Sequence, residues 1–143
     1  MFFADIDEII NYENMSLKEL TKIKGEGFYE KLERKTIASV LDFRNAVISA
    51  PLTAVVGEEN LRAIKKKTFV IFIKISNDRY VSKKQRERTA SGEKLKLGQD
   101  TFDERQRIFE NAADLTIDAK KDVKRTVDET IKQIRKYFGV DKI

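Results

Sequence analysis

The chain has 143 residues and contains neither cysteine nor histidine. Their absence excludes disulfides, thiolate metal sites, imidazole ligands and histidine-based catalytic triads, so any chemistry must use carboxylates, Lys, Arg, hydroxyls or the backbone. The net charge is +5, but the basic clusters lie among acids and carry no aromatic residues for base stacking, so we expect no nucleic-acid partner. A chain of this length can bury a core of its own, and we expect residues 1–143 to fold as a single domain.

No segment of the sequence resembles a membrane span or a secretion signal. The longest apolar run, "FVIFI" at 69–73, is far too short to cross a bilayer. Asp5, Asp7 and Glu8 interrupt the start of the chain, where a secretion signal needs basic and then apolar residues. We therefore expect a cytoplasmic protein with no membrane partner.

The first half of the sequence predicts two strands and two helices before residue 51. "FFADID" at 2–7 is typical of a short strand that ends in acids. The capping box formed by Ser16 and Glu19 predicts the start of a first helix. Apolar residues at helical spacing predict a second helix over 28–41, and "AVISA" at 46–50 predicts the second strand.

The second half continues the alternation of helices and strands. Leu61 and Ile64 predict a short helix, and "FVIFIKI" at 69–75 is typical of a strand buried on both faces of a parallel sheet. A helix over 102–112, a strand over 115–118 and an amphipathic helix over 123–138 follow. This order predicts an α/β domain, a three-layer α/β/α arrangement around a short parallel sheet of about four strands. The basic stretch 76–99 is expected to be a mobile, lid-like segment.

Two acids at the end of the first strand are the best site candidates on physical grounds. In parallel α/β folds, ligands bind outside the carboxyl ends of the strands. Asp5 and Asp7 could hold hydrated Mg²⁺ or accept hydrogen bonds from a polyol. Equally, Asp7 could merely cap the helix that follows.

Several stretches, taken in order and at their spacing, resemble landmarks of shikimate kinase, a phosphoryl-transfer enzyme with a phosphate-loop fold of the nucleoside-monophosphate-kinase type. The resemblance runs from Met1 to about Lys132 and implies use of ATP and Mg²⁺. The stretches are "FFADIDEII", "GEGFYEKLE", "AVISAPLTAVV", "FVIFIKIS" and "DERQRIFENAADLTID".

The resemblance implies roles for particular residues. It assigns Asp5 to the metal, and Asp7 to catalysis and to the shikimate hydroxyls. Arg105 matches the arginine that binds the shikimate carboxylate, and Arg86 and Arg88 are assigned to cofactor binding.

The sequence also departs from the family at separate places. It contains no G-x-x-x-x-G-K-[ST] phosphate loop, since none of its glycines is followed by Lys. Glu30 stands where the family has a second carboxylate-binding arginine, and Pro51-Leu52-Thr53 replaces three successive glycines. An acid repels a carboxylate ligand, and proline removes a backbone amide while Leu and Thr add bulk. We expect residues 51–53 to close that part of the pocket.

These departures predict a shikimate-kinase-like domain that is inactive as it stands and acts as a binding module, or pseudoenzyme, for a shikimate-like small molecule or a protein. One alternative is an active shikimate kinase whose phosphate loop comes from an upstream reading frame or another chain. Another is a functionless remnant. Because the family's central strand has no counterpart here, we expect the strands at 46–50 and 69–75 to pair directly with each other.

Overall fold

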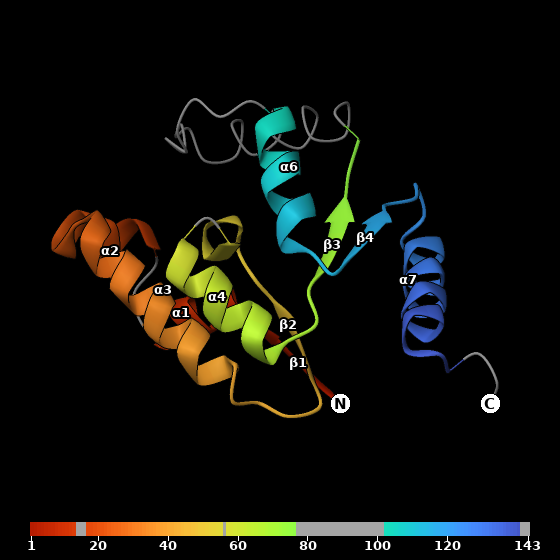
Figure 1. Cartoon of the computed structure of the whole chain (residues 1–143). Coiled ribbons are helices and arrows are strands. Elements are labelled where there is room, and N and C mark those ends of the chain that lie inside the picture. Colours follow the sequence, from red (N-terminus) through yellow and green to blue (C-terminus); the bar gives the residue numbers. More distant parts are fainter. Residues whose placement is uncertain (14–16, 56, 77–101, 141–143) are drawn as a thin grey trace. The chain divides into compact units, whose positions relative to one another are not determined.

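The computed structural model in Figure 1 describes residues 1–13, 17–55, 57–76 and 102–140. The chain divides into two compact units, Met1–Val70 and Ile71–Ile143. In its described residues, each unit contains one pair of parallel strands. That residues 1–143 form a single domain stays a prediction.

The described part of the first unit, residues 1–13, 17–55 and 57–70, forms two strands, four helices and a short 3₁₀ turn. Strand β1 pairs in parallel with β2, so that Phe2 lies opposite Ala46 and Asp5 lies opposite Ser49. In chain order the elements are β1 (Phe2–Asp5), α1 (Ile6–Glu13), α2 (Leu17–Lys24), α3 (Glu26–Val40), β2 (Ala46–Ser49), η1 (Leu52–Val55) and α4 (Glu58–Lys67).

The core of this unit lies where α1, α3, η1 and α4 meet. Ile6 and Ile10 are one turn apart on α1, and Ile37 and Val40 are one turn apart on α3, so each pair lies on one helix face. All four side chains are 1% exposed. Ala54 and Ile64 complete the buried cluster, which fixes α1 and α3 beside the end of β1.

The structure contains one helix that the sequence did not predict, α1, while the helix predicted from Ser16 is present as α2. We expected a strand through Asp7, but β1 ends at Asp5 and α1 begins at Ile6. The Asp5 carboxylate accepts a hydrogen bond from the Glu8 backbone N–H at 3.1 Å, a typical helix N-cap contact. Asp7 and Glu8 then lie in the first turn, where acids stabilise the positive end of the helix dipole. The predicted cap at Ser16 lies outside the described residues.

The second unit contains β3 (Ile71–Lys74), α6 (Phe102–Ala112), β4 (Leu115–Asp118) and α7 (Val123–Phe138). Strands β3 and β4 pair in parallel, with Ile71 opposite Leu115. Helix α6 packs on β3 through the rings of Phe72 and Phe109, whose centroids are 5.1 Å apart. At the start of α7 the Asp122 side chain accepts a hydrogen bond from the Lys124 N–H at 2.9 Å.

The α/β class and the parallel pairing are confirmed, but the predicted pairing between the second and third strands is wrong. Among the described residues, β2 pairs only with β1, and β3 pairs only with β4. Within the units, α1 packs on β1, α6 on β3 and α7 on β4. The lid-like segment predicted at 76–99 lies outside the described residues, apart from Ser76. Within the described ranges, no helix is long and apolar enough to cross a membrane.

Candidate functional site

Asp5 and Asp7 lie at the carboxyl end of β1, where the sequence predicted a site. Asp5 is the last residue of the strand and is half-buried, with one oxygen engaged by the Glu8 amide. Asp7 is one residue into α1 and is largely exposed. Partial burial of its carboxyl is the main reason that the pKa of Asp7 is raised, and the negative charge of Asp5 raises it further.

Tyr29 of α3 donates a hydrogen bond to the Asp7 carboxylate. This bond opposes the effects of burial and of Asp5 and lowers the pKa of Asp7. Burial, followed by the charges of Asp7 and Glu33 and by the hydrogen bond itself, raises the pKa of Tyr29 to about 12. The Tyr29 hydroxyl therefore remains a proton donor to Asp7 throughout the neutral range.

Glu33, one turn further along α3, has its own internal partner. The residue is 4% exposed, and its Oε1 accepts a hydrogen bond from the Thr53 hydroxyl. Burial raises the pKa of Glu33, the Thr53 hydrogen bond lowers it, and the charges of Asp7 and Glu30 raise it again. Because the charges of Asp7 and Glu33 influence each other, we treat Asp7, Tyr29, Glu33 and Thr53 as one group, the Tyr29–Glu33 cluster.

Local backbone structure explains how the cluster forms. Tyr29 and Glu33 are four residues apart on α3 and so lie on the same helix face. Thr53 lies in the 3₁₀ turn η1, whose first hydrogen bond runs from the Ala54 N–H to the Pro51 carbonyl at 3.0 Å. Ala54 is fully buried in the core, which holds the turn against the rest of the unit. Pro51 thus precedes a tight turn that brings the Thr53 hydroxyl to Glu33.

Replacing Thr53 by Val is expected to lower the free energy of unfolding by about 1–3 kcal/mol, because the buried Glu33 carboxylate loses its donor. Thr53→Ser is the matched control, since it keeps the hydroxyl. Urea unfolding of the two variants measures the difference. Equal stability of the Val and Ser variants would show that the bond contributes nothing.

Tyr29 is expected to ionise in the native protein with a pKa of about 12 instead of the ordinary 10.0. Since the folded-state pKa is the higher one, its contribution to stability is complete below pH 10 and is lost as the pH rises toward 12. Absorbance at the tyrosinate band follows the titration. Tyr29→Phe should remove the component near 12, and an unchanged titration curve would contradict the assignment.

The structure does not describe the side chains of the three predicted arginines, so it does not test whether they lie near Asp7. Arg105 lies in α6, in the other unit, and its side chain is outside the described residues. Arg86 and Arg88 fall in the stretch 77–101, which is also outside them. Glu30 is exposed on α3 beside the cluster and adds negative charge to it. The roles assigned to Arg86, Arg88 and Arg105 stay predictions.

The described acids do not form a magnesium site of their own. In the described ranges there is no group of three or more Asp, Glu, His or Cys residues that could hold a metal ion. One Asp5 oxygen caps α1, and the Asp7 carboxylate accepts the Tyr29 hydroxyl. Magnesium favours six oxygen ligands, several of them waters or substrate phosphates. The metal role of Asp5 stays a prediction.

Comparison with known proteins gives consistent matches along the chain. The shikimate kinase family model matches residues 1–135. A shikimate kinase of Sulfurihydrogenibium sp. is 26% identical over 140 residues, which cover 95% of this chain and 84% of that protein. A shikimate kinase of Aquifex aeolicus is 27% identical over 132 residues, which cover 90% of this chain and 78% of that protein.

Solved structures agree on the fold. The crystal structure of the Aquifex aeolicus shikimate kinase superposes with a TM-score of 0.74 at 23% identity, covering 94% of this chain and 80% of that one. The Acinetobacter baumannii shikimate kinase, solved in complex with shikimate, gives a TM-score of 0.77 at 14% identity and covers 99% and 80% of the two chains. These neighbours have the α/β phosphate-loop kinase fold. Because the family model spans nearly the whole sequence, the chain belongs to the shikimate kinase family.

Proposed function

We propose that this chain is a shikimate-kinase-like domain that works by binding a protein or a shikimate-like small molecule, without transferring phosphate on its own. The observation that carries the proposal is the hydrogen bond from Tyr29 to the Asp7 carboxylate. Asp7 is the residue that the family resemblance assigns to the substrate hydroxyls. A ligand hydroxyl would have to compete with the Tyr29 hydroxyl for the Asp7 carboxylate.

Three further features support the same proposal. Thr53, in place of a family glycine, donates to the buried Glu33, and Glu30 adds an acid where the family has an arginine. The printed sequence has no phosphate loop, so backbone amides and a lysine that would hold the transferring phosphate are missing from it. The family uses ATP and Mg²⁺, and we propose that this chain by itself holds neither in a productive complex.

Isothermal titration tests the proposal. ATP titrated into the protein with Mg²⁺ should give no specific heat. Heat from ATP with a 1:1 stoichiometry would favour the alternative of an active kinase.

A second titration tests the residues whose roles the family resemblance implies. If shikimate or a related polyol binds at all, Asp7→Asn and Arg105→Ala should each abolish the binding, because they remove the hydroxyl acceptor and the carboxylate partner. Asp5→Asn should reduce it only when Mg²⁺ is present. Unchanged affinity in both of the first two variants would remove the family site from this chain.

A further inference from the structure

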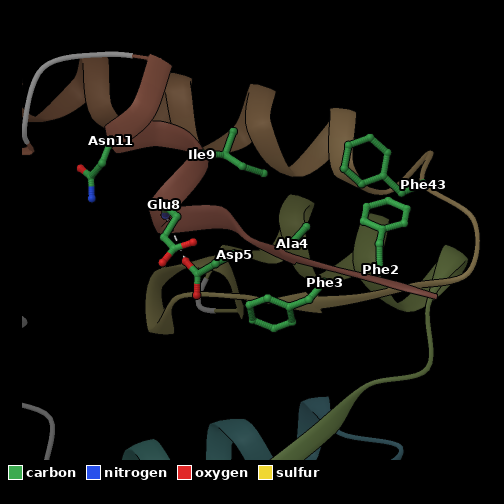
Figure 2. Close-up of a pocket in the computed structure, with 8 residues that line it drawn as sticks. All are labelled: Phe2, Phe3, Ala4, Asp5, Glu8, Ile9, Asn11 and Phe43. Carbon is green, nitrogen blue, oxygen red and sulfur yellow. Dashed lines mark hydrogen bonds between the residues drawn. The ribbon is translucent and has the colours of Figure 1, made fainter.

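A shallow groove of about 780 Å³ runs along β1 (Figure 2). Four of its lining residues are the whole of β1 and none comes from β2, so we infer that the groove lies at the outer edge of β1. The others come from α1 and from the loop before β2. The lining residues are Phe2, Phe3, Ala4, Asp5, Glu8, Ile9, Asn11 and Phe43.

The hydrogen-bond register of β1 turns part of its backbone toward this groove. The Phe2 N–H donates to the Asn45 carbonyl at 3.0 Å, and Phe2 lies opposite Ala46 in the parallel ladder. In a parallel pair, successive residues turn their backbone groups to opposite edges. The N–H and C=O of Phe3 therefore point to the outer edge, where no second ladder forms among the described residues.

Aromatic side chains make one end of the groove apolar. The rings of Phe2 and Phe43 contact each other with centroids 5.2 Å apart, yet the residues remain 48% and 43% exposed. Phe3 is 65% exposed. Exposed aromatic residues grouped beside an open strand edge are typical of a surface that another apolar side chain covers.

The other end of the groove is acidic. Asp5 and Glu8 lie there side by side, joined by the Glu8 N–H bond to the Asp5 carboxylate, with Asn11 on the next turn of α1 (Figure 2). Among the residues that the structure describes, no Lys or Arg lines the groove, although the whole chain carries a net charge of +5. The local charge therefore favours a cationic side chain over an anionic one.

We propose that the groove binds an extended peptide segment of another protein, which adds to β1 as a strand. Main-chain hydrogen bonds to Phe3 hold the segment, one of its apolar side chains covers Phe2 and Phe43, and a Lys or Arg lies against Asp5 and Glu8. This inference rests on the proposed function, for which it names the kind of protein segment bound, but it uses none of the residues of the Tyr29–Glu33 cluster. The ATP and shikimate titrations can succeed or fail independently of it.

Fluorescence anisotropy with blocked, labelled peptides tests the proposal on the full chain. The probe is the pentapeptide KVFVK, which offers an apolar centre and a basic residue at either end. We expect it to bind at least about tenfold more tightly than EVFVE, because EVFVE places a glutamate instead of a lysine against Asp5 and Glu8. N-methylation of the central amide should weaken binding by a similar factor, because it removes a strand hydrogen bond.

Two charge-reversal variants locate the binding. Glu8→Lys should weaken KVFVK binding at least about tenfold. Glu58→Lys reverses another exposed acid in the first turn of a helix, α4, and is the matched control. It should leave binding unchanged, with circular dichroism checking that both variants fold. In the wild type, the amide resonance of Phe3 should shift when the peptide is added.

Three results would overturn the proposal: equal affinity for KVFVK and EVFVE, equal losses in the two variants, or an unshifted Phe3 amide. A dimer in sedimentation that excludes the peptide would assign the groove to a second copy of the chain and would overturn it as well.

Discussion

We expect this chain alone to show no ATP-dependent phosphorylation of shikimate. Phosphoryl transfer depends on donors that surround the transferring group, and the printed sequence has no G-x-x-x-x-G-K-[ST] loop to supply them. Asp7 is already engaged by Tyr29, and Glu30 adds negative charge beside it. A coupled assay of ADP release, run with ATP, Mg²⁺ and shikimate, measures the rate.

An active shikimate kinase assayed in parallel is the control for the coupling system. Turnover by this chain in the usual enzyme range of ~1 to 1,000 per second would contradict the proposed function. If that turnover vanished in Asp7→Asn, the family's catalytic site would have to be intact.

Ile37→Ala is expected to lower the free energy of unfolding of the first unit by about 2–5 kcal/mol, because it leaves a cavity in a packed core. Ile37 is 1% exposed and belongs to the cluster that holds α1 against α3. The loss of stability is larger if the side chains around Ile37 do not move into the cavity. Urea unfolding followed by circular dichroism measures it.

The matched control is Ile23→Ala on α2, where the side chain is 64% exposed. Since surface substitutions usually change stability by less than about 0.5 kcal/mol, this variant should unfold like the wild type. Similar losses for Ile37→Ala and Ile23→Ala would mean that the core does not lie where the structure has it.

Periodicity predicted most of the secondary structure because the apolar residues of this chain follow the helix or strand repeat closely. The helices over 26–40 and 123–138 and the strands over 46–49 and 115–118 lie where their patterns indicated. Helix α1 was missed because "FFADID" was interpreted as one strand through Asp7. The contact that starts the helix is a hydrogen bond from the Glu8 N–H to the Asp5 side chain, which the pattern of apolar residues does not encode.

Strand pairing was harder to predict than strand position. The apolar and β-branched residues of 46–49 and 71–74 predict that both segments form strands, but they do not specify which strand pairs with which. Each of these strands pairs with the partner in its own unit, Phe2–Asp5 for the one and Leu115–Asp118 for the other. The helices α1, α6 and α7 pack on β1, β3 and β4, and such packing is a tertiary property that a strand's own sequence does not encode.

The candidate site was predictable only in part. The position of Asp5 and Asp7 at the end of a first strand could be predicted, because strand-end acids are visible in the sequence, while their roles in a site stay predictions. The Tyr29–Glu33 cluster was missed as a unit, although the four-residue spacing of Tyr29 and Glu33 on a predicted helix was available as a signal. The link to Thr53 depends on a 3₁₀ turn twenty residues away from Glu33 and could not be inferred from spacing.

The most direct test of the account is a calorimetric titration of shikimate into the wild type and into the double variant Tyr29→Phe/Glu30→Arg. The variant frees the Asp7 carboxylate and replaces the repelling acid by a cation. We predict that the variant binds shikimate at least about tenfold more tightly than the wild type does. Equal affinity in the two proteins, or weaker binding to the variant, would contradict the account.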